Sequence, residues 1–309
     1  MQTPARIAIL GLGLIGSSLA RAIRARLPGT VLSGHDASAA VRARAAELGL
    51  VDALHDAPGQ AVAGADLVLL AVPLGAMASL AAEIAPALAA GAIVSDVGSS
   101  KLAVIEQLAP LLPPHAHLVP AHPVAGTEKS GPDAGFASLF EGRWAILTPA
   151  EGTDPQAVAA VEALWEALGS RVERMTARHH DLVLAVTSHL PHLIAYSIVG
   201  TASDLEEVTR GEVIKYSAGG FRDFTRIAAS DPVMWRDVFL MNRDAVLEIL
   251  ARFSEDLAAL QRAIRWGDGE ALFRRFEASR AIRRAIIDAG QDTPEPDFGR
   301  QHGEPSPGQ

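Results

Sequence analysis

Hydrophobic and polar residues form two alternating patterns along the first half of the chain. Short apolar runs, which are typical of buried strands, are separated by longer stretches whose apolar residues recur at helical spacing. The strand-like runs are 6–10, 31–36, 65–73, 92–97, 118–122 and 144–148, and the helical stretches are 14–27, 77–88 and 155–168, the last after an Asp154 cap. This alternation predicts an α/β fold with a doubly wound, mostly parallel sheet.

The pattern changes after residue 176, where long helical stretches replace the strand-like runs. We expect helices at 179–199, 205–215, 233–264 and 269–289, with an Asp231-Pro232 cap before the third. The chain therefore divides into a predicted α/β domain (1–175), an all-α domain (176–290) and a Pro-, Gly- and polar-rich tail (291–309) that we expect to be disordered. Because the helical domain is rich in apolar residues, we expect it to form a homodimer.

The first strand-like run leads into a glycine-rich turn of the Rossmann type. Gly11, Gly13 and Gly16 have the spacing at which the first permits a tight bend, the second admits a pyrophosphate, and the third lets the helix pack closely. The helix that follows directs its unpaired N–H groups at the phosphates. The residues predicted to contact the dinucleotide are Gly11, Leu12, Gly13, Leu14, Ile15, Gly16, Asp36, Val72, Pro73 and Ser99.

Asp36 bears on the choice of cofactor. It follows Gly16 by 20 positions, where a carboxylate accepts hydrogen bonds from the adenine ribose and repels a 2′-phosphate. We therefore predict NAD, while Arg42 and Arg44 leave NADP open. A solvated residue or helix cap at position 36 is the structural alternative.

Two polar stretches follow strand-like runs. Residues 95–101 (Ser-Asp-Val-Gly-Ser-Ser-Lys) open a helix, and residues 122–131 form a glycine-rich loop that begins with a histidine. His122, at a strand end, is well placed to act as a general base beside a nicotinamide. A capped turn and an ordinary loop histidine are the structural alternatives.

A third polar stretch, residues 187–192, interrupts an otherwise apolar helix. Ser188 and His192 are four residues apart and share a helix face, and Pro191 is expected to kink the helix. Polar side chains in such a helix need partners, which a substrate or a neighbouring helix supplies.

Composition excludes several classes of protein. The chain has 309 residues, 49% of them hydrophobic, and a net charge of −9, which fits about two domains and argues against a nucleic-acid partner. It has no cysteine for a disulfide framework. We also expect no metal site, since no ligand set has suitable spacing, and no membrane partner, since no apolar stretch reaches the ~20 residues of a span. A cytoplasmic protein is predicted.

Five motifs, in this order, resemble the prephenate/arogenate dehydrogenase family. They comprise the glycine turn with Asp36, residues 96–101, residues 122–131, residues 188–192 (Ser-His-Leu-Pro-His), and residues 219–226 (Gly-Gly-Phe-Arg-Asp-Phe-Thr-Arg) with Trp235. The resemblance implies oxidative decarboxylation of prephenate to 4-hydroxyphenylpyruvate, or of arogenate to tyrosine, with reduction of NAD(P)+. It also implies a Rossmann domain joined to a helical dimerisation domain.

The resemblance implies roles for individual residues. His122 is similar to the catalytic histidine that accepts a hydrogen bond from the ring C4 hydroxyl, and Ser99 to the serine that orients it. Arg226 is similar to the arginine that holds the side-chain carboxylate of the substrate. The other residues predicted to line the substrate pocket are Ser188, His189, His192, Arg222, Thr127 and Glu128.

Some alternatives stay open. Arg222 stands where the family motif has a lysine, and the two arginines are alternatively structural partners of Asp223 or Glu128. A β-hydroxyacid dehydrogenase would need a catalytic lysine in the helical half, where Lys215 is the only one; a non-catalytic NAD-sensing protein would need neither His122 nor Arg226. We expect no regulation by an appended effector domain, while competition by tyrosine at the active site stays open.

Overall fold

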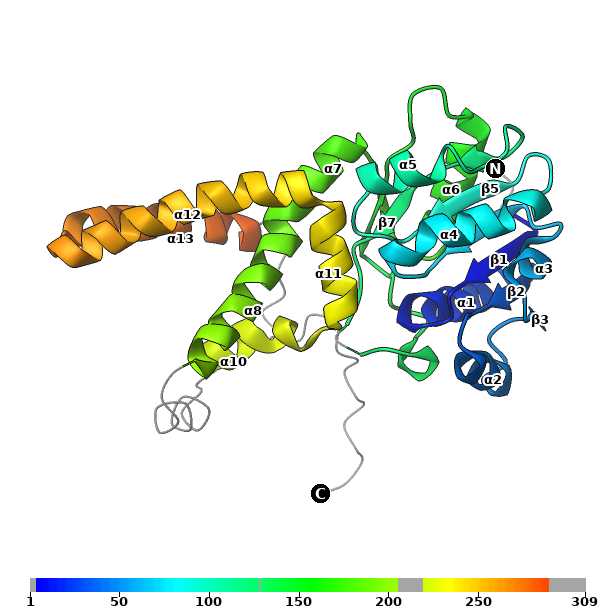
Figure 1. The fold of residues 1–309 in the computed structure, drawn as a ribbon, viewed down its shortest axis with the longest axis horizontal. Helices are drawn as coiled ribbons and strands as arrows, with labels where there is room; N and C mark the ends of the chain where they lie inside the picture. The colour runs from blue at the N-terminus through cyan, green and yellow to red at the C-terminus, as the bar shows by residue number, and fades with distance from the viewer. Residues whose placement is uncertain (1–3, 128, 205–218, 289–309) are drawn as a thin grey trace, which may run out of the picture. The chain divides into compact units, whose positions relative to one another are not determined.

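The computed structural model describes residues 4–127, 129–204 and 219–288 (Figure 1). Its first half confirms the predicted Rossmann-type sheet: six parallel strands lie in the order β3-β2-β1-β4-β5-β6. These strands are β1 (Arg6–Leu10), β2 (Val31–His35), β3 (Ala53–Leu54), β4 (Leu67–Leu70), β5 (Ile93–Asp96) and β6 (His117–Leu118). The register pairs Leu10 with His35 and with Leu70, and Leu70 with Asp96, so four strands end at one edge.

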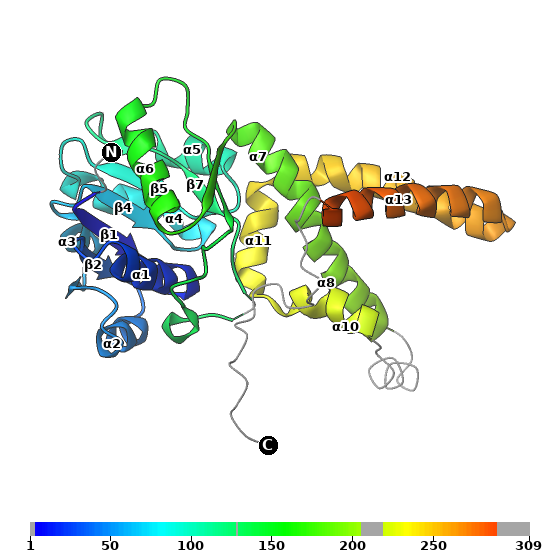
Figure 2. The same cartoon turned by 180° about the vertical axis from the view of Figure 1, so that it is seen from behind.

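Helices cover both faces of this sheet (Figures 1 and 2). They are α1 (Leu14–Arg26), α2 (Ala39–Glu47), α3 (Pro58–Val62), α4 (Leu74–Ile84), α5 (Leu102–Leu108) and α6 (Pro155–Ala167). Successive residues of a strand point to opposite faces: Ile7 and Ile9 pack with α1 and α6, whereas Ala8 and Leu10 pack with α4 and α5. The predicted Asp154 cap is present, since its carboxylate accepts from Gln156 N at 2.8 Å.

The predicted strand at 118–122 is wrong, because it is two strands in different sheets. β6 ends at Leu118 in the parallel sheet, and β7 (Ala121–Pro123) begins a second sheet of order β7-β8-β9. The chain changes sheet around Pro120, which has no N–H to donate to a ladder. β8 (Trp144–Leu147) was predicted, and β9 (Arg171–Arg174) was not.

After Thr176 the described residues form helices. These are α7 (Ala177–Leu184), a π-helical turn η3 (Ala185–His189), α8 (Leu190–Ser203), α10 (Gly219–Thr225), a 3-10 turn η4 (Arg226–Ala229), α11 (Pro232–Met241), α12 (Arg243–Trp266) and α13 (Gly269–Asp288). The Asp231 cap is present, accepting from Val233 N and Met234 N at 2.8 and 2.9 Å. The predicted helix at 205–215 and the tail at 291–309 lie outside the described residues.

Two further expectations for the helical half need correction. The single helix predicted at 233–264 breaks at Asn242, whose backbone leaves the helical region at φ −104° and ψ 32°. The expectation that no apolar stretch is long enough for a bilayer is also wrong, because the 27-residue helix Ala177–Ser203 contains an 18-residue window with a mean hydropathy of 1.6. Its first turns nevertheless hold His180 and Asp181, both buried and bonded to other parts of the protein, as described below.

The described residues separate into two compact units, which divide between Val246 and Leu247. In the first unit, α11 packs against the α4 face of the sheet through Trp235 and Val238, which lie in one apolar cluster with Leu74 and Met77. The helical half thus contacts the Rossmann sheet beside the strand ends. The second unit contains the pair formed by most of α12 and by α13, joined at Gly267, where φ is +64°.

Candidate active site

The glycine-rich turn has the geometry expected of a dinucleotide cradle. Gly11 has a φ of +93°, and a Cβ there would lie 2.4 Å from Ala71 O; a Cβ on Gly16 would lie 1.8 Å from Gly11 O. A Cβ on Gly13 would meet nothing within 4 Å. Tight packing at the first and third glycines, with open space above the second at the start of α1, fits a pyrophosphate at the helix N-terminus.

The side chains predicted to accompany this turn lie at the same edge of the sheet. Asp36 Oδ2 accepts from Leu12 N at 2.8 Å and Oδ1 accepts from Ser38 N at 2.9 Å, so the carboxylate is fixed beside the turn. Each oxygen keeps a lone pair for a ribose hydroxyl. Val72, after β4, contacts the turn too, since its Cγ1 lies 2.9 Å from a Cβ built on Gly11. Pro73, which is exposed, is the N-cap of α4.

The two arginines that left NADP open are both engaged by carboxylates. Arg42 pairs with Asp56 at 3.0 Å and donates to Asp36 O at 2.7 Å. Arg44 pairs with Asp133 at 2.6 Å. Both guanidinium groups therefore already have anionic partners, and Asp36 places a further negative charge where a 2′-phosphate would bind.

The stretch at 95–101 contains a buried ion pair. Lys101 Nζ contacts Asp96 Oδ2 and also donates to Ala121 O at 2.8 Å, and both charged side chains are fully buried. Asp96 Oδ2 accepts from Gly98 N at 2.8 Å as well. The pair therefore joins the end of β5 to the residue before His122. Ser99 lies half-buried in the same loop.

His122 lies on β7 and is 8% exposed. Its Nδ1 is 2.9 Å from Nε2 of His180, on α7. Ser99 was predicted to orient His122, and that role stays a prediction. Burial holds the pKa of His122 well below its usual 6.5, and nearby His180, Lys101 and His189 act in the same direction. His122 is therefore neutral at neutral pH, as a general base must be.

The stretch at 187–192 does not continue as a regular α-helix. The helix widens into the π-turn η3 directly before Pro191, which cannot donate a backbone hydrogen bond. π-turns of this kind often occur at functional sites. Ser188 and His189 lie in this turn, and His192 Nδ1 donates to Ser188 O at 2.9 Å. Ser188 and His192 are half-buried, whereas His189 is fully buried.

His192 connects α8 to the fifth sequence motif, residues 219–226 with Trp235. It stacks on Trp235 of α11, with ring centroids 3.6 Å apart. Burial lowers the pKa of His192 from 6.5, and the charge of Arg226 lowers it further. Arg226 begins η4, directly after α10, so Arg222 precedes it by about one helical turn. The Arg222 side chain is 77% exposed and lies 4.0 Å from Asp223.

The loop after β7 reaches toward the cofactor helix. Thr127 is half-buried and its Oγ1 accepts from Lys129 N at 3.2 Å. Further along, Phe136 N donates to Ser18 Oγ of α1 at 3.1 Å. The loop is thereby anchored on α1, beside the glycine turn. Glu128 lies outside the described residues.

Three functional candidates were missed from the sequence: His180, Asp181 and Asn242. His180 Nδ1 lies 2.8 Å from Asp181 Oδ1, and Asn242 Nδ2 donates to Asp181 O at 2.8 Å and lies 3.0 Å from His189 Nδ1. A signal was present, because a His-Asp pair in the first turns of an apolar helix needs buried partners. Asn242 had only the weak signal of a polar residue between apolar helical stretches.

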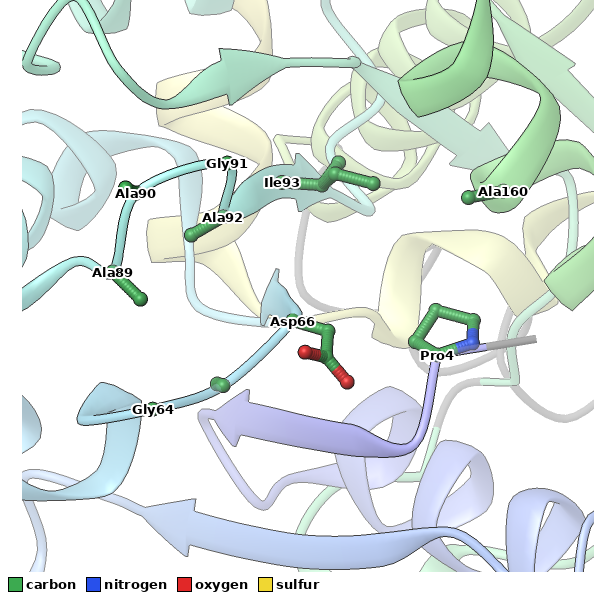
Figure 3. Close-up of a pocket in the computed structure, with 10 residues that line it drawn as sticks. Pro4, Gly64, Asp66, Ala89, Ala90, Gly91, Ala92, Ile93 and Ala160 are labelled. Carbon is green, nitrogen blue, oxygen red and sulfur yellow. The ribbon is translucent and has the colours of Figure 1, made fainter. Parts of the chain in front are cut away.

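A separate pocket lies at the opposite edge of the sheet (Figure 3). It is lined by residues that precede β1, β4 and β5, including Pro4, Gly64 and Gly91. Its one charged lining residue, Asp66, already accepts from Ala5 N and Arg6 N at 3.0 and 2.9 Å. Because ligands of doubly wound sheets bind at the carboxyl ends of the strands, this pocket is not the candidate site.

Lowering the pH is expected to destabilise the protein, because the buried histidines of the site are neutral in the folded state. Burial lowers the pKa of His189 from 6.5 to about 4, so the unfolded chain binds this proton more readily and stability falls as the pH drops below about 6.5. For His189 the loss reaches about 3 kcal/mol once the pH is below about 4. Urea unfolding between pH 7 and 5 measures this. The free energy of unfolding should depend less on pH in His189→Gln than in the wild type, and as much as in the wild type in the exposed control His179→Gln. A free energy of unfolding that does not change with pH in the wild type would contradict the expectation.

Comparison with known proteins agrees with the site. Two family models match consecutive parts of the chain: "Prephenate dehydrogenase, nucleotide-binding domain" over residues 19–174 and "Prephenate dehydrogenase, dimerization domain" over residues 176–278. A cyclohexadienyl dehydrogenase of Zymomonas mobilis is 50% identical over 280 residues, covering 91% of this chain and 95% of that protein. A prephenate dehydrogenase of Bacillus subtilis is 36% identical, covering 91% and 76%.

A solved structure agrees as well. The prephenate dehydrogenase of Aquifex aeolicus in complex with hydroxyphenyl propionate and NAD+ superposes with a TM-score of 0.85 at 33% identity, covering 93% of this chain and 99% of that one. The two matching models and these relatives extend over both halves of the chain. This protein is a member of the prephenate dehydrogenase family.

Proposed function

We propose that this protein catalyses the oxidative decarboxylation of prephenate to 4-hydroxyphenylpyruvate with NAD+. Family membership supports the activity, and the observation that carries the assignment is the buried, neutral His122 beside the carboxyl edge of the sheet. His122 is hydrogen-bonded to His180 of α7, and Asn242 joins the neighbouring Asp181 to His189. His189 and His192 both pack against Trp235, and the charge of Arg226 lowers the pKa of His192. These contacts support a site with the base at one end and the guanidinium near the other. Activity on arogenate is the alternative, since it presents the same ring and carboxylate.

The chemistry requires little from the protein beyond a base and positioning. When bound, NAD+ supplies the hydride acceptor. As hydride leaves ring carbon C4, His122 accepts the proton of the C4 hydroxyl, and a carbonyl forms there. The bond from the ring to its carboxylate then breaks, CO2 leaves, and the electron pair makes the ring aromatic, while the carbonyl oxygen takes the proton back from His122 and becomes a phenol. Proton transfer to such a base contributes roughly 100- to 10,000-fold in rate.

Substrate anchoring is assigned to Arg226, with the other pocket residues in supporting roles. A dianionic substrate needs cations, and arginine offers a planar pair of donors to a carboxylate. The residues assigned to line the remaining pocket are Ser188, His189, His192, Arg222, Thr127 and Glu128, and Ser99 is assigned a place between His122 and the nicotinamide. The supporting observation is that η3 and α8 contact Trp235 through His189 and His192, and that η4, which begins with Arg226, packs against α8.

Removing the Arg226 guanidinium is expected to weaken substrate binding. In Arg226→Gln, KM for prephenate should rise about 10- to 100-fold, because a charged hydrogen bond contributes about 1.5–3 kcal/mol, while kcat changes less. Steady-state kinetics measures both constants. Arg222→Gln, on the exposed position one turn earlier, is the matched control and should change KM less. Equal KM values in Arg226→Gln and the wild type would rule out this anchor.

NAD+ is assigned over NADP+ because of the environment of Asp36. Its carboxylate is fixed at the glycine turn, and Arg42 and Arg44 are paired with Asp56 and Asp133. Residues 1–175 are accordingly assigned as the nucleotide-binding domain and 176–290 as the substrate and dimerisation domain. A cytoplasmic location is proposed, in keeping with a nicotinamide-dependent enzyme that has no cysteine.

One assay tests the proposed function. NADH or NADPH absorbance is followed with prephenate, arogenate and a 3-hydroxy acid, each offered with NAD+ and with NADP+. We expect turnover of prephenate with NAD+ and no turnover of the 3-hydroxy acid. Turnover of the 3-hydroxy acid alone would support a β-hydroxyacid dehydrogenase instead, and binding of NAD+ without turnover of any substrate would leave a sensing role.

A homodimer formed by the helical half is also proposed. Phe273 and Phe276 of α13 are 60% and 57% exposed, and a partner subunit would cover such apolar side chains. Light scattering should give twice the 32.4 kDa chain mass for the wild type and the single mass for Phe273→Glu/Phe276→Glu. Ala281→Glu, on the polar face with Glu277 and Arg284, is the control and should stay dimeric. A monomeric wild type would contradict the proposal.

A further inference from the structure

We propose that His180 and Asp181 hold His122 in the one neutral tautomer that leaves its Nε2 atom without a proton. This inference rests on the proposed function, in which His122 accepts the C4 hydroxyl proton. It is carried by a linear series of hydrogen bonds, from His122 Nδ1 to His180 Nε2 at 2.9 Å and from His180 Nδ1 to Asp181 Oδ1 at 2.8 Å. All three side chains are buried.

The direction of the series is set at Asp181. Its Oδ1 accepts from Lys101 N at 2.7 Å and its Oδ2 from Leu102 N at 2.9 Å. The ring Nδ1 of His180 is the third nitrogen that approaches this carboxylate. An ionised carboxylate only accepts hydrogen bonds. The Nδ1 atom of His180 must therefore carry a proton.

The neutral state of His180 then determines the next bond. Burial lowers the pKa of His180 from 6.5, and the Lys101 charge acts in the same direction against the opposing effects of Asp181 and Asp96. Neutral imidazole carries one proton, and that proton is on Nδ1, so Nε2 of His180 is an acceptor. His122 must donate from its own Nδ1. Since His122 is neutral too, its Nε2 keeps the lone pair that a general base uses.

Both ends of this series are attached to rigid elements. Asp181 accepts two N–H groups at the start of α5 and thereby fixes α7 to that helix. Lys101, whose backbone N–H it accepts, donates from Nζ to the carbonyl of Ala121, directly before His122. The imidazole of His122 is thus positioned through its backbone by Lys101 and through its ring by His180. The arrangement has the same logic as the carboxylate–histidine pair that sets a tautomer in hydrolases.

Substitutions at His180 separate tautomer control from mere packing. In His180→Phe no acceptor remains, so His122 is free to place its proton on Nε2, and kcat should fall about 100-fold with KM for prephenate and Kd for NAD+ within about twofold of wild type. In His180→Gln the amide donates to Asp181 and accepts from His122, so activity should return to within about tenfold of wild type. His179→Gln, the exposed neighbour on α7, is the matched control and should behave as wild type.

Histidine-selective ¹⁵N NMR of the full-length enzyme reads the tautomer directly, with His122→Asn used to assign the signals. We expect Nδ1 of His122 to be protonated and Nε2 bare in the wild type and in His180→Gln, and a mixed or reversed state in His180→Phe. A protonated Nε2 in the wild type, or an unchanged tautomer in a folded His180→Phe, overturns the inference. If the tautomer is as expected but no cyclohexadienyl substrate turns over, the proposed function fails instead.

Discussion

Replacing His122 with asparagine is expected to lower kcat for prephenate by roughly 100- to 10,000-fold, because the general base is lost. Asparagine keeps a polar side chain but has no basic nitrogen. KM and the affinity for NAD+ should change little, since the anchoring guanidinium and the glycine turn are untouched. Steady-state kinetics and a binding titration with NAD+ measure the two effects separately.

A matched control for this substitution is His117→Asn. His117 belongs to the neighbouring strand β6, where it lies 3.7 Å from Asp154 and plays no part in the site. Its kinetics should match those of the wild type. Activity of His122→Asn within threefold of the wild type would remove His122 from the catalytic step.

The same neutral base gives a pH profile unlike that of an exposed histidine. Because burial places the pKa of His122 in the free protein well below 6.5, kcat/KM for prephenate should show no acidic inflection at 6.5, and the loss of activity should begin at lower pH. The charge of Lys101 and the nearby His189 also lower the pKa of His122.

The second large effect is expected for the buried ion pair. In Lys101→Met, Asp96 stays buried without its cation, and the free energy of unfolding should fall by about 3–5 kcal/mol, the usual cost of leaving one buried charge unpaired. Urea unfolding followed by circular dichroism measures the change. The exposed control Lys129→Met removes the same charge and should change stability by less than about 0.5 kcal/mol.

A double variant separates this explanation from a simple packing defect. Lys101→Met/Asp96→Asn removes both charges, while the amide oxygen still accepts from Gly98 N. It should be more stable than Lys101→Met alone. A double variant at least as unstable as the single one would show that the lost packing of the lysine stem, rather than the unpaired carboxylate, is responsible.

The nucleotide-binding half was predictable because its signals are local. Gly11 needs a positive φ, Gly16 has no room for a side chain, and Asp36 must end the second strand, so each requirement appears as a residue type at a fixed spacing. Apolar runs likewise predicted the central strands, because parallel strands buried on both faces are apolar throughout.

The errors arose where tertiary contacts decide the structure. Residues 118–122 are one apolar run by composition, yet the chain leaves one sheet and enters another at Pro120. Helical spacing is continuous across Asn242, and the break there accompanies the bonds from its side chain to Asp181 and His189. The His180-Asp181 pair in an apolar helix indicates a need for buried partners, but that His122 is the partner follows from the approach of α7 to β7, which no sequence spacing encodes.

The crystal structure of the enzyme with NAD+ and 4-hydroxyphenylpyruvate tests the central claim most directly. We expect the His122 imidazole at hydrogen-bond distance, about 2.6–3.2 Å, from the phenol oxygen of the product, with the nicotinamide on the adjoining face of the ring and Arg226 on the side-chain carboxylate. A product whose phenol oxygen lies away from His122 in every subunit, or whose carboxylate is bound without Arg226, would contradict it.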